Sequence, residues 1–378
     1  MATPVAQVVK VNWKLVFPWL SLFRALGLAL HVRQVLVGVV AALLIALGEK
    51  LIGGIEFPTN SPAFAFKPAL ISWVWLPWVD LLFPLAPPWL FGTPGITWRP
   101  KAESWFLFQS VLRFVWVLVV GGLAGGILVR RAGMEFAREE SVGALATVRF
   151  VFRRAIDYLS APALPLAVVG TLGGLLWLTG LLAHVIPGGG YLLSAVWGLV
   201  LIAGIIMAVL LIAVVLGWPL MIAAVSLNGG DGFDSLSRGF GFVLDRWRYF
   251  AWCIAIMTVY GLVSQLLVLS VLHFGEFLAG TSLGWHTQSW NRGDLPQIVP
   301  AAVWPFVFGM LFRGFAYSFF WSSMAIIYLV LRQSLDNAEL HDVYVEGSPH
   351  DADTLQSLPP ANPPESPPPT LLPIINQP

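Results

Sequence analysis

The chain has 378 residues, of which 57% are hydrophobic and only 11% are charged, whereas a soluble domain carries about 25% charged residues. This composition excludes a water-soluble enzyme fold for most of the chain and indicates a polytopic membrane protein. The net charge of +1 gives no indication of nucleic-acid binding. The single cysteine, Cys253, excludes an intramolecular disulfide and a metal site built from several cysteines.

Six segments are long and apolar enough to cross a bilayer, which takes about 20 residues of helix. They lie at residues 34–52, 105–129, 161–185, 191–217, 249–272 and 301–331. The third and fourth share one stretch without Asp, Glu, Lys or Arg, which the turn signal Pro187-Gly188-Gly189-Gly190 divides. We therefore predict an all-α membrane helical bundle, residues 1–335, with six transmembrane helices.

A Trp- and Pro-rich outer loop, residues 53–104, follows the first span and contains a mostly apolar segment at 69–91. Several prolines interrupt this segment, and Asp80 lies near its middle. Because proline removes helix hydrogen bonds, we favour an interfacial or re-entrant segment over a seventh span. The segment's aromatic residues suit the headgroup layer, among them Trp73, Trp75, Trp78 and Trp89.

Most of the 21 Lys and Arg residues fall in segments that face the cytoplasm if both termini are cytoplasmic. The positive-inside rule therefore predicts this orientation. Residues 336–378 are polar and rich in proline, which predicts a disordered cytoplasmic tail that contains polyproline-II segments. Such a tail is either passive or a ligand for a protein partner that recognises proline-rich segments.

An amphipathic segment precedes each pair of spans, so the six spans are predicted to form three hairpins. The apolar stripes run at helical spacing from Trp13 to Phe23, from Val142 to Leu159 and from Phe233 to Trp247. This pattern is typical of helices that lie in the membrane surface, although it also fits the ends of bent spans. The basic residues that we assign to the interface are Arg149, Arg153, Arg154, Arg238, Arg246 and Arg248.

Two arginines inside predicted spans are the candidate site residues, Arg113 and Arg313. A charge within the hydrocarbon usually faces the bundle interior or water. Tyr317 lies one turn after Arg313 on the same face. The functional interpretation is a site for an anion or a lipid headgroup. The structural interpretation is a bridge to Glu276, Asp294 or a carbonyl, or a side chain that extends to the interface.

The loop that begins at Asn228 has some features of a calcium site, but the glutamate that an EF-hand needs at its end is missing. We instead predict a helix start at which Asp231 or Asp234 caps free N–H groups, with Asp234 paired to Arg238. No motif of a hydrolase, protease or nucleotide-binding protein is present, so we expect no enzyme activity, no metal and no cofactor.

Glycine pairs at helical spacing, Gly121-Gly122 with Gly125-Gly126 and Gly170 with Gly174, allow helix backbones to approach closely. We expect them to pack within the chain rather than to drive dimerisation.

The segment 231–249 resembles a known bacterial pattern, in which an Ala/Ser-Leu-x-Arg-Ser/Gly-Phe segment leads through a basic and aromatic end, similar to Arg-Trp-Arg, into the next span. The matching positions here are Ser235, Leu236, Arg238, Gly239, Phe240, Arg246, Trp247 and Arg248. The pattern is similar to that of six-span families of unknown function related to the membrane domain of glycerophosphoryl diester phosphodiesterases. The resemblance implies an inner-membrane protein, and the catalytic domain of those phosphodiesterases is missing from this sequence.

Two functions remain open from the sequence. The first is a non-enzymatic inner-membrane protein that organises membrane lipids or partner proteins. The second is a carrier for a small anionic or lipid-like solute that uses Arg113 and Arg313.

Overall fold

The computed structural model describes residues 18–53, 73–82, 100–284, 300–336 and 343–344. The chain divides into two units, Met1–Val343 and Tyr344–Pro378, and every helix discussed below belongs to the first. Most of the predicted tail, residues 337–342 and 345–378, lies outside the described residues. The first unit nevertheless extends beyond residue 335, because α13 runs to Asp336 and Val343 is buried.

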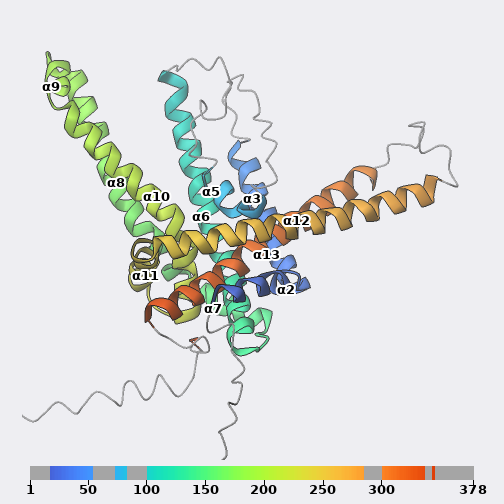
Figure 1. Cartoon of the computed structure of the whole chain (residues 1–378). Coiled ribbons are helices and arrows are strands. Elements are labelled where there is room, and N and C mark those ends of the chain that lie inside the picture. The colour runs from blue at the N-terminus through green and yellow to red at the C-terminus, as the bar shows by residue number, and fades with distance from the viewer. Residues whose placement is uncertain (1–17, 54–72, 83–99, 285–299, 337–342, 345–378) are drawn as a thin grey trace, which may run out of the picture. The chain divides into compact units, whose positions relative to one another are not determined.

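All regular secondary structure in the described part of the chain is helical, as predicted (Figure 1). In chain order the helices are η1 (Pro18–Arg24), α2 (Ala25–Ala29), α3 (Val32–Gly53), α5 (Leu76–Leu82), α6 (Pro100–Arg138), α7 (Ala144–Arg153), α8 (Ala155–Val185), α9 (Gly189–Ala195), α10 (Trp197–Asn228), α11 (Gly232–Asp245), α12 (Trp247–Gly284) and α13 (Pro300–Asp336).

Six of the helices within the described residues are long and apolar enough to cross a membrane, which confirms the predicted number. They are α3, α6, α8, α10, α12 and α13. Several extend beyond the predicted spans, and α6 continues to Arg138 although its apolar part ends near residue 129. Charged residues marked the predicted end, but Arg130 and Arg131 are buried against the protein and the helix continues through them.

The second and third amphipathic segments are each divided by a short break. α7 ends at Arg153 and α8 begins at Ala155, so Ile156 and Leu159 lie on the first turns of a spanning helix. In the same way α11 ends at Asp245 and α12 begins at Trp247. Of the first segment, residues 13–17 lie outside the described part of the chain.

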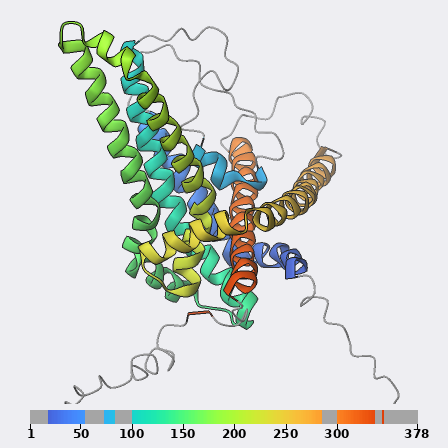
Figure 2. The ribbon, with the colours of Figure 1, turned by 60° about the vertical axis from the view of Figure 1, so that its left-hand side comes forward.

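α13 forms the core of the bundle. Its most apolar stretch is buried throughout, whereas the corresponding stretch of α8 contains no buried residue. α8 and α10 run side by side in both views, and α9 lies at the turn between them (Figure 1, Figure 2). α13 approaches α3 closely, because a side chain at Gly38 would overlap the backbone of Gly314. The first and last spanning helices are therefore direct neighbours.

The glycines of α6 receive large aromatic side chains from three other helices. A Cβ at Gly125 would lie 2.5 Å from the ring of Trp321, and one at Gly126 would lie 2.7 Å from the ring of Tyr158. Trp218 of α10 packs over Gly121 and meets Trp321 edge to face, with 5.2 Å between ring centroids. These glycines pack within the chain, as expected. Gly170 and Gly174 of α8, in contrast, have open space around them.

Two neighbouring glycines of α6 give a matched test of this packing. Gly125→Ala should lower the melting temperature in detergent, because its methyl group would press on Trp321 and overpacking costs about 1–3 kcal/mol. Gly122→Ala should leave the melting temperature unchanged or raise it slightly, since its methyl group would lie 3.6 Å from Ile222. Equal melting temperatures for the two variants would contradict the packing.

Candidate functional site

Residues 73–82 pack against α12 and α13, and most of their side chains are buried or half-buried. The indole N–H of Trp75 donates to Thr258 Oγ1 at 3.1 Å, and the Gln265 amide donates to the carbonyl of Trp73 at 2.8 Å. Trp78 is buried edge to face against Phe320, at 5.4 Å between ring centroids. Gln265 and Thr258 thus link α12 to this segment, and its tryptophans contact protein side chains.

The seven residues of α5 are too few to cross a membrane, so the described part of the segment 69–91 is not a seventh span. Its burial against α12 and α13 favours the re-entrant interpretation over the interfacial one. The flanking residues 69–72 and 83–91 lie outside the described part of the chain. Irregular backbone at membrane depth is tolerated where protein surrounds it, which matches the contacts of this segment.

Asp80 of α5 is the acidic partner that the sequence analysis missed. Its side chain is buried, and the hydroxyl of Tyr317 donates a hydrogen bond to its carboxylate. Burial opposes the ionisation of Asp80, and the positive charge of Arg313, one turn before Tyr317, favours it. Arg313 is thus attracted to a buried acid, although no described ion pair joins the two side chains. This agrees with the structural interpretation but names a different acid.

The side chains of the two acids that the sequence analysis offered as partners of Arg313 are not described by the structure. Asp294 and the side chain of Glu276 lie outside the described residues. The signal that could have identified Asp80 was its position, since it is an acid in an otherwise apolar segment.

Arg113 is half-buried on α6, and no described hydrogen bond or ion pair connects it to Arg313. Gln109, one turn earlier, donates to the carbonyl of Ile52 at the end of α3, at 3.3 Å. The Nε atoms of Arg113 and Arg313 are both buried without a hydrogen-bond partner. The structure therefore assembles Arg313 and Tyr317 with Asp80, and it does not show Arg113 joining them.

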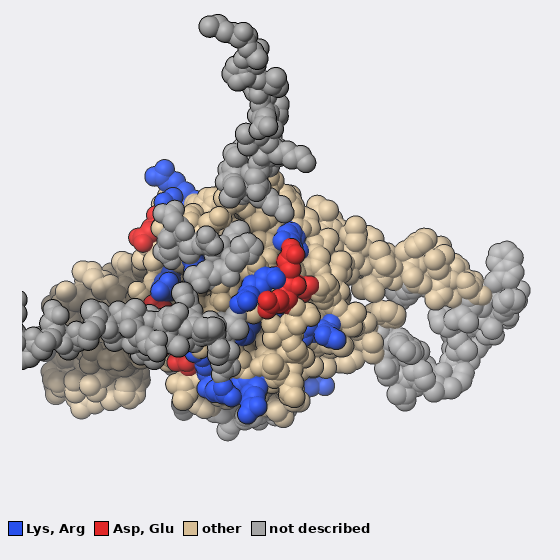
Figure 3. All heavy atoms as spheres, turned by 90° about the horizontal axis from the view of Figure 1, so that it is seen from below, with Lys and Arg blue, Asp and Glu red and all other residues tan. Residues whose placement is uncertain are grey.

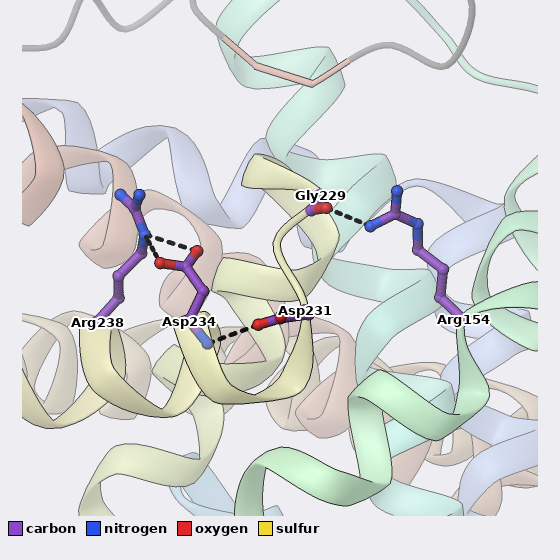
Figure 4. Close-up of polar contacts among 5 residues, drawn as sticks. All are labelled: Arg154, Gly229, Asp231, Asp234 and Arg238. Atoms are coloured by element: carbon purple, nitrogen blue, oxygen red, sulfur yellow. Dashed lines mark hydrogen bonds and ion pairs between the residues drawn. The ribbon is translucent and has the colours of Figure 1, made fainter.

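A second group of arginines holds the C-terminal end of α10. The last carbonyls of a helix have no partner within it. Arg130 of α6 donates to the carbonyl of Ser226 at 2.7 Å, and Arg154, at the break between α7 and α8, donates to that of Gly229 (Figure 4). Both guanidinium groups also lie over the ring of Phe150, at 3.5 and 5.3 Å from its centroid.

The same helix end has a further buried polar contact. The hydroxyl groups of Tyr158 and Ser226 are 2.9 Å apart, and Ser226 also donates to the carbonyl of Ile222 at 2.8 Å. Gly229, with φ of +67°, lets the chain leave α10 in a left-handed turn. Of the basic residues assigned to the interface, Arg154 is thus a structural contact. Arg130, which the sequence analysis did not single out, is its counterpart.

The start of α11 is capped as predicted. The Asp231 carboxylate accepts a hydrogen bond from the Asp234 N–H at 2.8 Å, and Arg238 pairs with Asp234 at 2.9 Å (Figure 4). These contacts account for both acids as a helix cap and an ion pair within one helix. Arg238 is therefore engaged in an ion pair within α11.

The remaining basic residues assigned to the interface are exposed: Arg149, Arg153, Arg246 and Arg248. Exposed apolar side chains lie close to them in the sequence, among them Leu145, Phe152, Ile156, Phe233, Leu244 and Trp247. Figure 3 shows a face of the molecule on which Lys and Arg gather in several groups, with Asp and Glu beside some of them. The arginines therefore divide into one set that holds helices together and one set that faces outward.

We call the contacts of Arg130 and Arg154 with the last carbonyls of α10 the clamp. The clamp predicts that replacing a buried arginine lowers stability more than replacing an exposed one. Arg130→Met should destabilise the protein by about 2 kcal/mol, because it removes a charge-assisted hydrogen bond to a buried carbonyl. Arg149→Met, on the neighbouring helix, should have little effect because this side chain is exposed. Thermal melting in detergent measures both. A normal melting temperature for Arg130→Met would show that the clamp is dispensable.

The counter-charge of Arg313 predicts coupling between two substitutions. Arg313→Met should lower the melting temperature, because it leaves the Asp80 carboxylate buried without its counter-charge. Asp80→Asn should also lower it, because it leaves the arginine uncompensated. The double variant should lose less than the sum of the two single losses. Strictly additive losses would show that Asp80 and Arg313 do not interact.

Comparisons with known proteins add nothing to the roles assigned above, which depend on the geometry alone. No protein-family model matches the sequence. No significant similarity to a curated protein or to a solved structure was found either. The resemblance of residues 231–249 to six-span families related to phosphodiesterase membrane domains therefore stays a prediction.

Proposed function

We propose that this protein is a non-enzymatic module of the bacterial inner membrane that organises anionic lipid at the cytoplasmic surface. The observation that carries the proposal is the pairing of exposed apolar side chains with exposed arginines on and beside α7 and α11. Both termini are cytoplasmic in this proposal, in accord with the distribution of Lys and Arg.

α7 separates its side chains by environment. Phe150 and Val151 are buried against the protein, whereas Leu145 is 82% exposed and Phe152 is 61% exposed. The same exposed side continues into the first turn of α8, where Ile156 is 81% exposed. Apolar side chains so placed gain free energy if they enter the acyl region of a bilayer. Arg149 and Arg153 lie beside them, in reach of the headgroups.

α11 also has one face buried against the protein and one exposed apolar face, and it has a third face that is polar. Ser235 and Gly239 are buried, and Phe233 and Leu244, three turns apart, are exposed on another side. Asp234 and Arg238 form their ion pair on the remaining side. Protein, lipid and water would each meet one face of a helix that lies in the membrane surface.

Anionic lipids are the ligand class that matches this surface. An arginine near an anionic leaflet contributes about 1 kcal/mol of binding free energy, so four together give a substantial preference. A protein partner that binds the proline-rich segment within residues 336–378 is a further part of the proposal, and nucleic acid has no role in it.

The carrier alternative has one observation in its favour, the buried Nε atoms of Arg113 and Arg313 that lack a hydrogen-bond partner. Against it, Asp80 accepts the hydrogen bond of Tyr317 and attracts the positive charge of Arg313. A solute anion would have to compete with this internal carboxylate, so we favour the lipid-organising module.

Replacing the four exposed arginines Arg149, Arg153, Arg246 and Arg248 by Gln should reduce the anionic lipid that the purified protein retains. Native mass spectrometry from detergent measures the retained lipid, after equilibration with phosphatidylglycerol and phosphatidylcholine together. The melting temperature should change little, because the substituted side chains are exposed.

The matched control replaces the same four residues by Lys, which keeps the charge and should keep the anionic lipid. Undiminished phosphatidylglycerol in the Gln variant would refute the proposal. If the module is instead a carrier, Arg113→Gln and Arg313→Gln should remove a retained anion that the four-residue variant keeps.

A further inference from the structure

The beginning of α3 has the features of an anion site. The first N–H groups of a helix have no partner within it, and the helix dipole places partial positive charge there. α3 has 22 residues, and its first turn carries Arg33, which is exposed. The preceding helix is held in place because Ser318 of α13 donates to the carbonyl of Ala29 at 2.9 Å.

Arg131 of α6 supplies an independent observation at this place. Its side chain is only 8% exposed, and its Nη1 atom is buried without a hydrogen-bond partner. Leu128, three residues earlier on α6, and Glu135, four residues later, contact Gln34 and His31 at the beginning of α3, so Arg131 lies beside the start of that helix. Two arginines at this place, one of them with an unused buried donor, favour the binding of an anion.

The acids that face this position are already engaged. Glu135 attracts Arg131, but its carboxylate is bonded to the ring of His31 at 3.0 Å. Glu139 lies 3.7 Å from Arg24, whose guanidinium group also lies over the ring of Phe136. Glu139 is thus paired with Arg24, and Glu135 supplies one negative charge against the two positive charges of Arg33 and Arg131.

The surface that continues from Arg33 is apolar. Val32, Leu36 and Val40 recur at four-residue spacing along α3, and all three are exposed. A lipid whose phosphate lies at the first turn of α3 could extend its acyl chains along this stripe. A free phosphate would gain nothing from it.

We infer that Arg33, Arg131 and the N–H groups of Val32 and Arg33 bind a phosphate-bearing anion, supplied by the headgroup of a membrane phospholipid. Phosphate oxygens accept hydrogen bonds from guanidinium groups in the forked geometry that arginine offers, and helix N-termini bind the same group. This site goes beyond the surface of α7 and α11, because it selects one lipid at a fixed position and uses different residues.

The test titrates the full-length protein in detergent with dioctanoyl phosphatidylglycerol, dioctanoyl phosphatidylcholine and, separately, inorganic phosphate, following the melting temperature. The wild type should be stabilised most by phosphatidylglycerol. Arg33→Gln should weaken this effect about tenfold in ligand concentration, the scale of one lost charge-assisted contact. Arg33→Lys should weaken it less. Arg24→Gln is the control, because Arg24 is paired with Glu139 and should leave the titration unchanged.

Arg131→Met should abolish the effect. Since that variant could fail to fold, the exposed Arg33 carries the decisive comparison. Equal protection by inorganic phosphate, lost in Arg33→Gln, would support the anion site and assign it to free phosphate. An unchanged titration of Arg33→Gln, or equal protection by phosphatidylcholine, would overturn the inference. The four-residue variant of α7 to α12 keeps this site, so the two proposals fail separately.

Discussion

The other elements depend on the contacts that Arg130 and Arg154 make with the C-terminal end of α10. Its carbonyls cannot be left without partners in an apolar protein, and Arg130 and Arg154 supply the donors. Because these two arginines come from α6 and from the break between α7 and α8, the contact joins three segments. Gly229 then turns the chain into α11, whose first residues are capped by Asp231. The clamp thereby holds the end of α7 and the start of α11 beside the end of α10.

The same requirement explains the interior of the bundle. Asp80 lies on a helix too short to span, yet it is buried because Tyr317 and Arg313 offer a hydrogen bond and an opposite charge. Arginines that contact carbonyls or carboxylates within the protein are therefore structural. The arginines that the proposed function assigns to lipid are the exposed ones on α7 and around the start of α12, and this difference in exposure separates the proposed function from the structural core.

The sequence predicted the number of spans because apolar length is a property of each segment alone. It predicted the cap at Asp231 for the same reason, since residue and partner are three positions apart. The bond between Tyr317 and Asp80 joins residues 237 positions apart, and no local pattern indicates it. The role of Arg130 was hidden too, because an arginine just after an apolar stretch has the same sequence context whether it faces water or a carbonyl.

The central claim is that the clamp holds α7 and α11 with their apolar sides in the lipid. Accessibility of spin labels in nanodiscs tests it directly, in a Cys253→Ser background with single labels at Phe152, Leu244 and, as reference, Glu140. We predict that labels at 152 and 244 are relaxed by oxygen and shielded from a water-soluble nickel complex, while the label at 140 shows the reverse. Labels at 152 and 244 that are as open to the nickel complex as the one at 140 would contradict the account.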